Sequence, residues 1–436
     1  MIEPPVEKVI HEDEFGSLLQ TGSAPFFGLV HALLAAGPRE WRKLHYHQLL
    51  HDANSLESFL DDYGARYNQR YHFFTELVAG VRGLATAAYS LAHLTGRLGS
   101  YGAADWLPPA LLDATVQRLD RASGFLNDGL ERMLLEARVE AERLGAKPSG
   151  ALQEERGWLK VTPQNKLPRS LGQDQLQDEG QRIAEVASKY IQAADLLQSI
   201  RPRTLADPKA RTKFLRKHCT EEQARVYEAT VHNLQSTYDT HIKNTVLEAG
   251  DPRLGQLRGH ASCALHLFEA VTDLIHFQER HESEEREAVV ETSDRMRALV
   301  SPGELEEVLL ETLIVGAAEL LENGRAVAED LLPSYTNLQE LDCELMEGVS
   351  LHARPAALIV KIVQHHGTPV EMEVSGSICN AGSILELLVT VGSNPDTRHY
   401  VFRGDERPLR DIGLLFELGL GEGPDSLPGE LDYLRI

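Results

Sequence analysis

The sequence predicts a mainly α-helical N-terminal region followed by a smaller α+β domain. Two observations carry this prediction. Apolar residues recur at three- and four-residue spacing through most of residues 39–332, as in amphipathic helices. After Pro333 the period changes to two, and residues 369–374 alternate apolar and charged side chains as a half-buried strand does.

Helix-start signals divide the N-terminal region. Pro108–Pro109 opens a long helix that we expect to reach about Leu144. Four later starts combine a capping residue with Pro at the first helical position, or with Gln or Glu three residues on: Asp207–Pro208, Thr220 with Gln223, Asp251–Pro252 and Ser301 with Glu304. The last of these helices is expected to end at about Leu332. The aromatic pairs Phe26–Phe27 and Phe73–Phe74 are expected in the core.

The domain boundaries follow from these patterns. Residues 1–336 are predicted to form one or two helical bundles, and the Pro- and Gly-containing stretch 146–172 is the expected internal linker. A long loop inside one bundle fits that stretch equally well. Residues 338–423 are predicted to form the α+β domain, and residues 424–436 a C-terminal tail.

The α+β domain is predicted element by element. The order is strand, helix, strand, strand, helix, strand, helix, with the tight turn between the second and third strands at Ser375–Gly376. The expected ranges are 340–346, 353–365, 369–374, a short strand ending at 380, 383–391, 398–403 and 406–420. This order is typical of a sandwich with helices on one face of an antiparallel sheet.

Composition excludes several function classes. The net charge of −23 disfavours broad binding to nucleic acid or anionic membranes. The chain shows no secretory signal and no run of 18 apolar residues, so we expect a cytoplasmic protein without membrane insertion. Its four cysteines form no CxxC pair and are expected to be reduced thiols. No Gly-rich nucleotide loop is present, which argues against self-phosphorylation from ATP. We expect no cofactor.

One segment, around His352, has the residues expected of a phosphate-binding site. His352 stands at the expected N-cap of the helix 353–365, and Arg354 follows two residues later. The first amide groups of a helix lack intrahelical partners and point toward a bound anion. The amides of Ala353 and Arg354 are therefore the expected phosphate ligands, and the Arg354 guanidinium adds charge-assisted donors. A neutral imidazole at this position is the nucleophile that phosphoryl transfer requires.

The string Leu-His-Ala-Arg-Pro-Ala at 351–356 resembles the active-site motif of HPr, the histidine phosphocarrier of the sugar phosphotransferase system. A second string, Cys-Asn-Ala-Gly-Ser-Ile-Leu at 379–385, resembles the regulatory-serine segment of the same family. The resemblance covers about 85 residues and implies an HPr-like open-faced sandwich. It implies that His352 carries the phosphoryl group, that Arg354 assists and that an Enzyme I-like protein is the donor.

The same resemblance makes Ser383 the candidate regulatory serine, although a serine before a helix is first of all a capping residue. It places Ile384, Leu385 and Leu388 in the partner-docking patch. The sequence departs from the family at Ser350, where the family usually has Gly. Gly382 and Glu386 make the second-helix region less basic than usual, which weakens an encounter with an acidic docking face.

Histidines in the helical region suggest a weaker hypothesis. Glu269, Asp273, His276 and Arg280 share one face of a predicted helix, and Asp273 with His276 has the carboxylate-x-x-His spacing of metal sites in helical bundles. No second helix offers the matching Glu-x-x-His pair. We therefore expect ion pairing along this face and no metal.

The sequence favours a phosphotransferase-related carrier or regulator, a phosphoryl-group carrier and not a self-contained enzyme. Two alternatives remain open. The domain at 338–423 could be a degenerate HPr fold used only for protein interaction. The helical region could be an enzyme or ligand sensor that this domain switches, and buried polar groups clustered in a pocket would favour that alternative. The downstream phosphoryl acceptor is not indicated.

Overall fold

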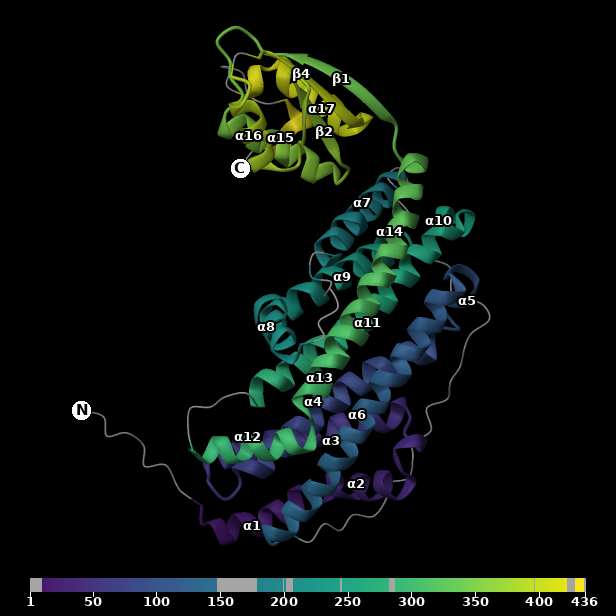
Figure 1. Cartoon of the computed structure of the whole chain (residues 1–436). Helices are drawn as coiled ribbons and strands as arrows, with labels where there is room; N and C mark the ends of the chain where they lie inside the picture. The colour runs from purple at the N-terminus through teal and green to yellow at the C-terminus, as the bar shows by residue number, and fades with distance from the viewer. Residues whose placement is uncertain are drawn as a thin grey trace, which may run out of the picture. The chain divides into compact units, whose positions relative to one another are not determined.

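The structure is a computed structural model that describes residues 10–146, 179–198, 200, 207–243, 245–281, 287–395, 397–421 and 428–434. The chain is mainly helical and carries a four-stranded antiparallel sheet near its C-terminal end, as the sequence predicts (Figure 1). The expected linker at 146–172 lies, apart from Ala146, outside the described residues.

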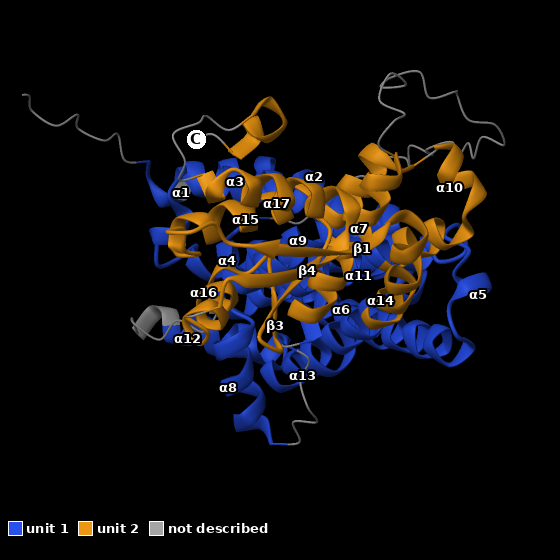
Figure 2. Ribbon diagram, turned by 90° about the horizontal axis from the view of Figure 1, so that it is seen from above, with its two compact units in different colours: residues 1–166, 197–232, 261–321 blue, residues 167–196, 233–260, 322–436 orange. Residues whose placement is uncertain are grey.

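Contacts divide the chain into two compact units, shown in different colours in Figure 2. Unit 1 comprises residues 1–166, 197–232 and 261–321, and unit 2 comprises residues 167–196, 233–260 and 322–436. The division falls within four helices: α7 (Glu179–Gln198), α9 (Glu221–His241), α11 (Pro252–His281) and α14 (Val315–Tyr335).

Among the described residues of unit 1, the regular elements are all helices joined by short turns. Its remaining elements are α1 (Glu12–Gly22), α2 (Ala24–Ala36), η1 (Pro38–Glu40), α3 (Lys43–Asp62), η2 (Ala65–Tyr67), α4 (His72–Arg97), α5 (Ala103–Trp106), α6 (Pro109–Arg143), α8 (Pro208–His218), α12 (Glu287–Leu299), α13 (Pro302–Glu307) and the π-helical segment η4 (Val308–Ile314). The aromatic pairs Phe26–Phe27 and Phe73–Phe74 are buried in its core, as predicted.

Capping side chains mark several of the predicted helix starts, among them Asp207 before α8 and Ser301 before α13. Thr220 and Gln223 form a complete capping box, because each side chain accepts the backbone N–H of the other residue. The helical pattern at 39–95 is nevertheless split into α3 and α4, since Gly64 adopts a left-handed φ of 68° that ends α3. Helix α14 runs to Tyr335, three residues beyond the predicted end, with Pro333 inside its last turn.

A helix that crosses a membrane needs about 20 consecutive, mainly apolar residues. Among the described helices, none is by itself long and apolar enough to cross a membrane. The bent pair 14–22 and 24–36, at an angle of 54°, passes the same test of length and composition when the two are taken together.

Unit 2 contains α10 (Val246–Gly250) and the sheet with its helices. The elements after α14 are β1 (Leu338–Glu344), α15 (Ala353–His366), β2 (Val370–Val374), β3 (Ser377–Asn380), α16 (Ile384–Gly392), β4 (His399–Asp405), α17 (Glu406–Glu417), η5 (Gly419–Gly421) and η6 (Gly429–Leu434). We call residues 338–434 the sheet domain. The strand order is β1-β4-β2-β3, and every neighbouring pair is antiparallel.

The sheet domain has one core. Strand residues alternate, so that Met372 and Phe402 face inward and are fully buried while Glu371 is exposed. The two hairpin residues Ser375 and Gly376 both have positive φ, as the tight turn predicted between β2 and β3 requires. Leu431 and Leu434 of η6 belong to the same core, although the sequence analysis placed them in a tail.

Candidate functional site

His352 is the N-cap of α15. Its backbone is extended, with φ −109° and ψ −167°, and its Nδ1 accepts the backbone N–H of Arg354 at 3.4 Å. The imidazole therefore takes the place that Ser or Asp usually takes at a helix start. This geometry directs one ring nitrogen toward the positive end of the helix, where an anion is stabilised.

The site combines an anchored backbone with exposed chemical groups. The flanking residues Leu351, Pro355 and Ala356 are buried, so the start of α15 is held in the domain core. The side chains of His352 and Arg354 are exposed. The exposed imidazole therefore stands on a backbone that the core holds in place.

The serine at position 350 is compatible with this loop. The bend before His352 uses Gly348, which has a φ of 80°, and the Val349 N–H donates to the Met346 carbonyl at 3.2 Å. Ser350 lies outside the left-handed region, so its Cβ causes no backbone strain. The serine at this position therefore leaves the start of α15 intact.

Ser383 is the N-cap of α16, and its Oγ accepts the Glu386 N–H at 3.4 Å. The Glu386 carboxylate reaches back and accepts the Asn380 N–H at 3.0 Å. The Asn380 side chain in turn accepts the Gly382 N–H at 2.8 Å. These contacts give both Ser383 and Glu386 a structural role at the start of the helix.

Replacement of Ser383 by Ala is expected to destabilise α16 by about 1 kcal/mol, because one N-terminal amide loses its acceptor. The measurement is amide hydrogen exchange in residues 384–392. The matched control is Ser377→Ala on exposed β3, which is expected to change exchange in α16 very little. Equal exchange in the Ser383 variant and the wild type would show that the cap contributes nothing.

The apolar surface of α16 differs in detail from the predicted patch. Ile384 is 43% exposed and Leu385 is 71% exposed. Leu388 is half-buried and packs against the domain core, whereas Val389 is 60% exposed. We therefore define the α16 patch as Ile384, Leu385 and Val389. Leu385 and Val389 lie one turn apart, which explains why they share an exposed face.

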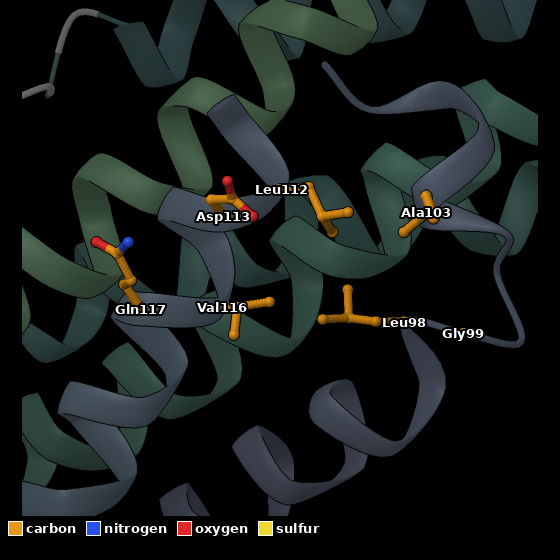
Figure 3. Close-up of a pocket in the computed structure, with 8 residues that line it drawn as sticks. Leu98, Gly99, Ala103, Leu112, Asp113, Val116 and Gln117 are labelled. Atoms are coloured by element: carbon orange, nitrogen blue, oxygen red, sulfur yellow. The ribbon is translucent and has the colours of Figure 1, made fainter. Parts of the chain in front are cut away.

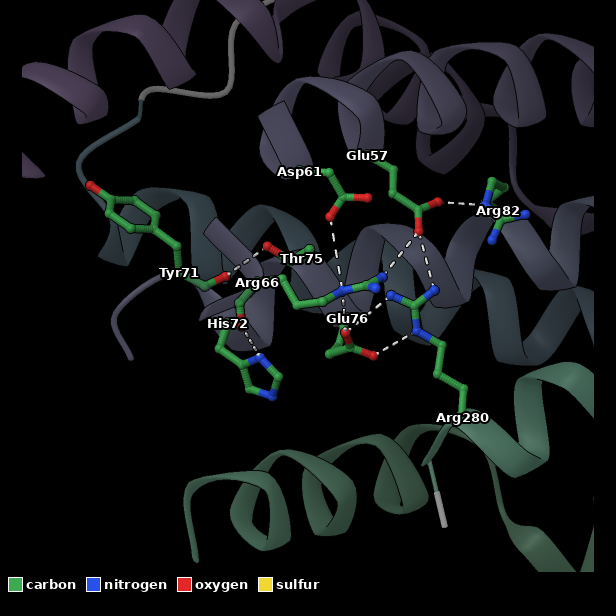
Figure 4. Close-up of polar contacts among 9 residues, drawn as sticks. All are labelled: Glu57, Asp61, Arg66, Tyr71, His72, Thr75, Glu76, Arg82 and Arg280. Atoms are coloured by element: carbon green, nitrogen blue, oxygen red, sulfur yellow. Dashed lines mark hydrogen bonds and ion pairs between the residues drawn. The ribbon is translucent and has the colours of Figure 1, made fainter. Parts of the chain in front are cut away.

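Unit 1 contains a buried ion network around Arg280 whose partners the sequence did not predict (Figure 4). The Arg280 guanidinium donates to Glu57 Oε1 at 3.1 Å and to both oxygens of Glu76, at 2.8 and 3.0 Å. Arg82 also pairs with Glu57, and Arg66 lies within 4 Å of both carboxylates. The spacing on α11 had singled out Arg280, but its partners lie on α3 and α4, about 200 residues away in sequence.

Two further polar contacts occur on α11. The His276 Nδ1 lies 2.9 Å from a Glu221 carboxylate oxygen, so the polar face of α11 is hydrogen-bonded to the start of α9 at this point. The His266 Nδ1 lies 2.9 Å from Glu269, and the His266 ring contacts that of His93 with centroids 4.6 Å apart. Burial and the nearby His266 and Lys43 lower the pKa of His93 to about 4.

In the part of the chain that the structure describes, no three His, Cys, Asp or Glu residues are placed to hold a metal ion.

A surface pocket of about 340 Å³ lies in unit 1 (Figure 3). Its walls come from the end of α4, from α5 and from the first turns of α6. Leu98, Leu112 and Val116 give it an apolar lining, and Asp113 and Gln117 are its largest polar residues. The buried charges described above are paired with one another in the bundle and do not line this pocket.

Comparison of the chain with protein-family models, with curated proteins and with solved structures gave no match.

Proposed function

We propose that the sheet domain is an HPr-like phosphocarrier and that His352 accepts a phosphoryl group from an Enzyme I-like donor. The observation that carries the proposal is the exposed imidazole at the N-cap of α15, with Nδ1 aimed at the helix amides. The strings at 351–356 and 379–385 support it, and so does the placement of both motifs at helix starts.

The proposed step is a phosphoryl transfer between two nitrogen atoms. The lone pair of the neutral His352 imidazole attacks the phosphorus of a phosphohistidine on the donor. The new N–P bond forms as the donor's N–P bond breaks, and the donor imidazole leaves with the electron pair. The proton on the other ring nitrogen of His352 is released and the departing donor ring takes up one proton, so the net charge is unchanged. The Arg354 guanidinium and the first amides of α15 stabilise the charge on the phosphoryl oxygens in the transition state.

The experiment that tests this function uses the full chain. The protein is incubated with phosphoenolpyruvate and Enzyme I, and phosphohistidine is detected as acid-labile, alkali-stable phosphate. Stoichiometric labelling that maps to the peptide with His352 is the expected result. If the domain is instead only a protein-interaction module, it takes up no phosphate but still binds Enzyme I. A measurement of Enzyme I binding therefore distinguishes this alternative from a protein that does not interact at all.

The charge around the α16 patch favours a specialised role over general sugar uptake. Glu386 is exposed at the start of α16, and the whole chain has a net charge of −23. Long-range attraction to an acidic donor is therefore weak, and apolar contact must supply more of the affinity. We propose a regulatory carrier in the cytoplasm, with a phosphoryl acceptor still to be identified.

The α16 patch is expected to control donor recognition. Leu385→Glu is expected to raise the donor's KM about tenfold, because it replaces an exposed apolar contact by a charge; this corresponds to about 1.4 kcal/mol. Leu338→Glu is the matched control, since Leu338 is 67% exposed on β1 of the same domain. Initial rates of phosphohistidine formation give both values. Equal KM values for the two variants would show that the α16 patch does not contact the donor.

A further inference from the structure

The link between α14 and the sheet domain is short, and hydrogen bonds fix it to the end of β4 and the start of α17. Only Thr336 and Asn337 separate α14 from β1. The Asn337 N–H donates to an Asp405 carboxylate oxygen at 2.7 Å, and its side-chain amide donates to Glu406 at 2.7 Å. The Glu406 N–H donates back to the Asn337 carbonyl at 2.9 Å. A connection of only two residues, one of them bonded to the sheet domain, allows the domain little independent movement.

A second attachment lies at the C-terminal end of α15. The Gln181 side chain of α7 lies 3.4 Å from His366 Nδ1. Beside it, Glu185 packs so closely on Gly367 that a Cβ built on this glycine would lie 2.5 Å from Glu185 Cγ and 3.2 Å from Glu185 Cβ. Both segments belong to unit 2. The contact is therefore between two parts of the same compact unit.

The sheet domain orients His366 for this contact. The imidazole Nε2 lies 2.8 Å from Asp411 Oδ2, and the Tyr433 hydroxyl donates to the same oxygen at 2.6 Å. Burial alone would raise the pKa of Asp411, but the hydrogen bonds from His366 and Tyr433 outweigh burial and lower this pKa below its ordinary value. An ionised Asp411 accepts a hydrogen bond from Nε2–H, and in that neutral tautomer Nδ1 is the acceptor for the Gln181 amide. The Tyr433 ring also stacks on His365, with centroids 3.7 Å apart.

The two ends of α15 therefore have different surroundings. The helix has 14 residues, so its ends lie about 21 Å apart. The buried His366 faces α7, whereas His352 at the other end is exposed. A protein that docks on the start of α15 has no need to displace α7.

We propose that α7 is an intramolecular docking partner of the sheet domain, and that the domain presents His352 while it stays docked. The contact between α7 and α15 follows from the distances given above, whereas its role in phosphoryl transfer rests on the proposed function. A docked carrier brings its helical region into the complex with the donor. The two attachments distinguish this arrangement from a carrier that swings on a flexible tether.

Cysteine cross-linking tests the docking in the full chain. The variant Glu185→Cys/Gly367→Cys places two Cβ atoms close to the separation found in disulfides. The four native cysteines are buried. Mild oxidation is expected to cross-link most of the chains, at least fivefold more than the control Lys189→Cys/Gly367→Cys, whose α7 position lies one turn away. Equal cross-linking of the two pairs would overturn the docking.

The same sample tests whether the docked domain presents His352. Diethyl pyrocarbonate modifies accessible neutral imidazoles, and mass spectrometry gives the rate at His352. The rates in the oxidised and reduced protein are expected to agree within twofold. Protection of His352 by tenfold or more in the cross-linked form would overturn this part of the proposal. Failure of the wild type to accept phosphate would contradict only the proposed function, since neither readout uses phosphoryl transfer.

A second variant avoids the strained position at Gly367, whose φ is 68°. Gln181→Ala/Glu185→Ala removes both α7 side chains without changing the sheet domain. Hydrogen exchange in residues 361–366 is expected to become about tenfold faster, while exchange in residues 384–392 stays unchanged. Wild-type exchange at 361–366 would show that α7 does not hold this end of α15.

Discussion

The His352→Ala variant is expected to take up no detectable phosphoryl group, less than about 1% of the wild-type label, while it remains folded. The imidazole is the only proposed nucleophile, so its loss removes the covalent step itself. The side chain is exposed, so its removal leaves no cavity in the core. Labelling with phosphoenolpyruvate and Enzyme I measures the effect, and hydrogen exchange across the sheet domain reports folding.

His399→Ala is the matched control for this prediction. His399 is an exposed histidine on β4 whose side chain is 62% exposed and lies 3.1 Å from Asp342. Its replacement is expected to leave phosphohistidine formation within twofold of the wild type. Label retained on the His352 variant, or lost from the His399 variant, would place the phosphoryl group on another residue.

The Arg280→Met variant is expected to lower the free energy of unfolding of unit 1 by about 3 kcal/mol. Glu57 and Glu76 are buried, and Arg280 lies 3.1 and 2.8 Å from their carboxylates, whereas Arg66 lies 3.7 Å from Glu76. Breaking a buried pair by removing one partner leaves a desolvated charge, which costs more than the pair itself contributed.

Tryptophan fluorescence in a denaturant titration measures this effect, because the three tryptophans of the chain are residues 41, 106 and 158 and none lies in the sheet domain. Arg225→Met is the control, since Arg225 is 61% exposed and pairs with Glu221 on the same helix. Its effect is expected to stay below about 1 kcal/mol. The double variant Glu76→Gln/Arg280→Met is expected to recover part of the lost stability. Similar losses for Arg280 and Arg225 would mean that burial adds nothing to the network.

Local patterns predicted the sheet domain's elements closely. The helix predicted at 353–365 is α15 at 353–366, and the strand predicted at 369–374 is β2 at 370–374. Alternation, capping residues and the Ser375–Gly376 turn act over a few residues, so they can be read from neighbouring positions. The N-cap position of His352 is of this kind, since helix starts depend on adjacent side chains and amides. The role of His352 in phosphoryl transfer stays a prediction.

Contacts between distant segments were decided only by the tertiary structure. Arg280 was identified on a polar face of α11, but Glu57 lies 223 residues before it, and no sequence period links the two. Tyr433 was placed in a tail, yet it bonds to Asp411 and stacks on His365. The helical pattern also did not predict the break between α3 and α4, because periodicity does not detect a single left-handed residue such as Gly64. The sequence by itself determined the order of elements and the place of His352 at a helix start. Packing decided which charges meet, because those pairs form only after segments far apart in the chain have come together.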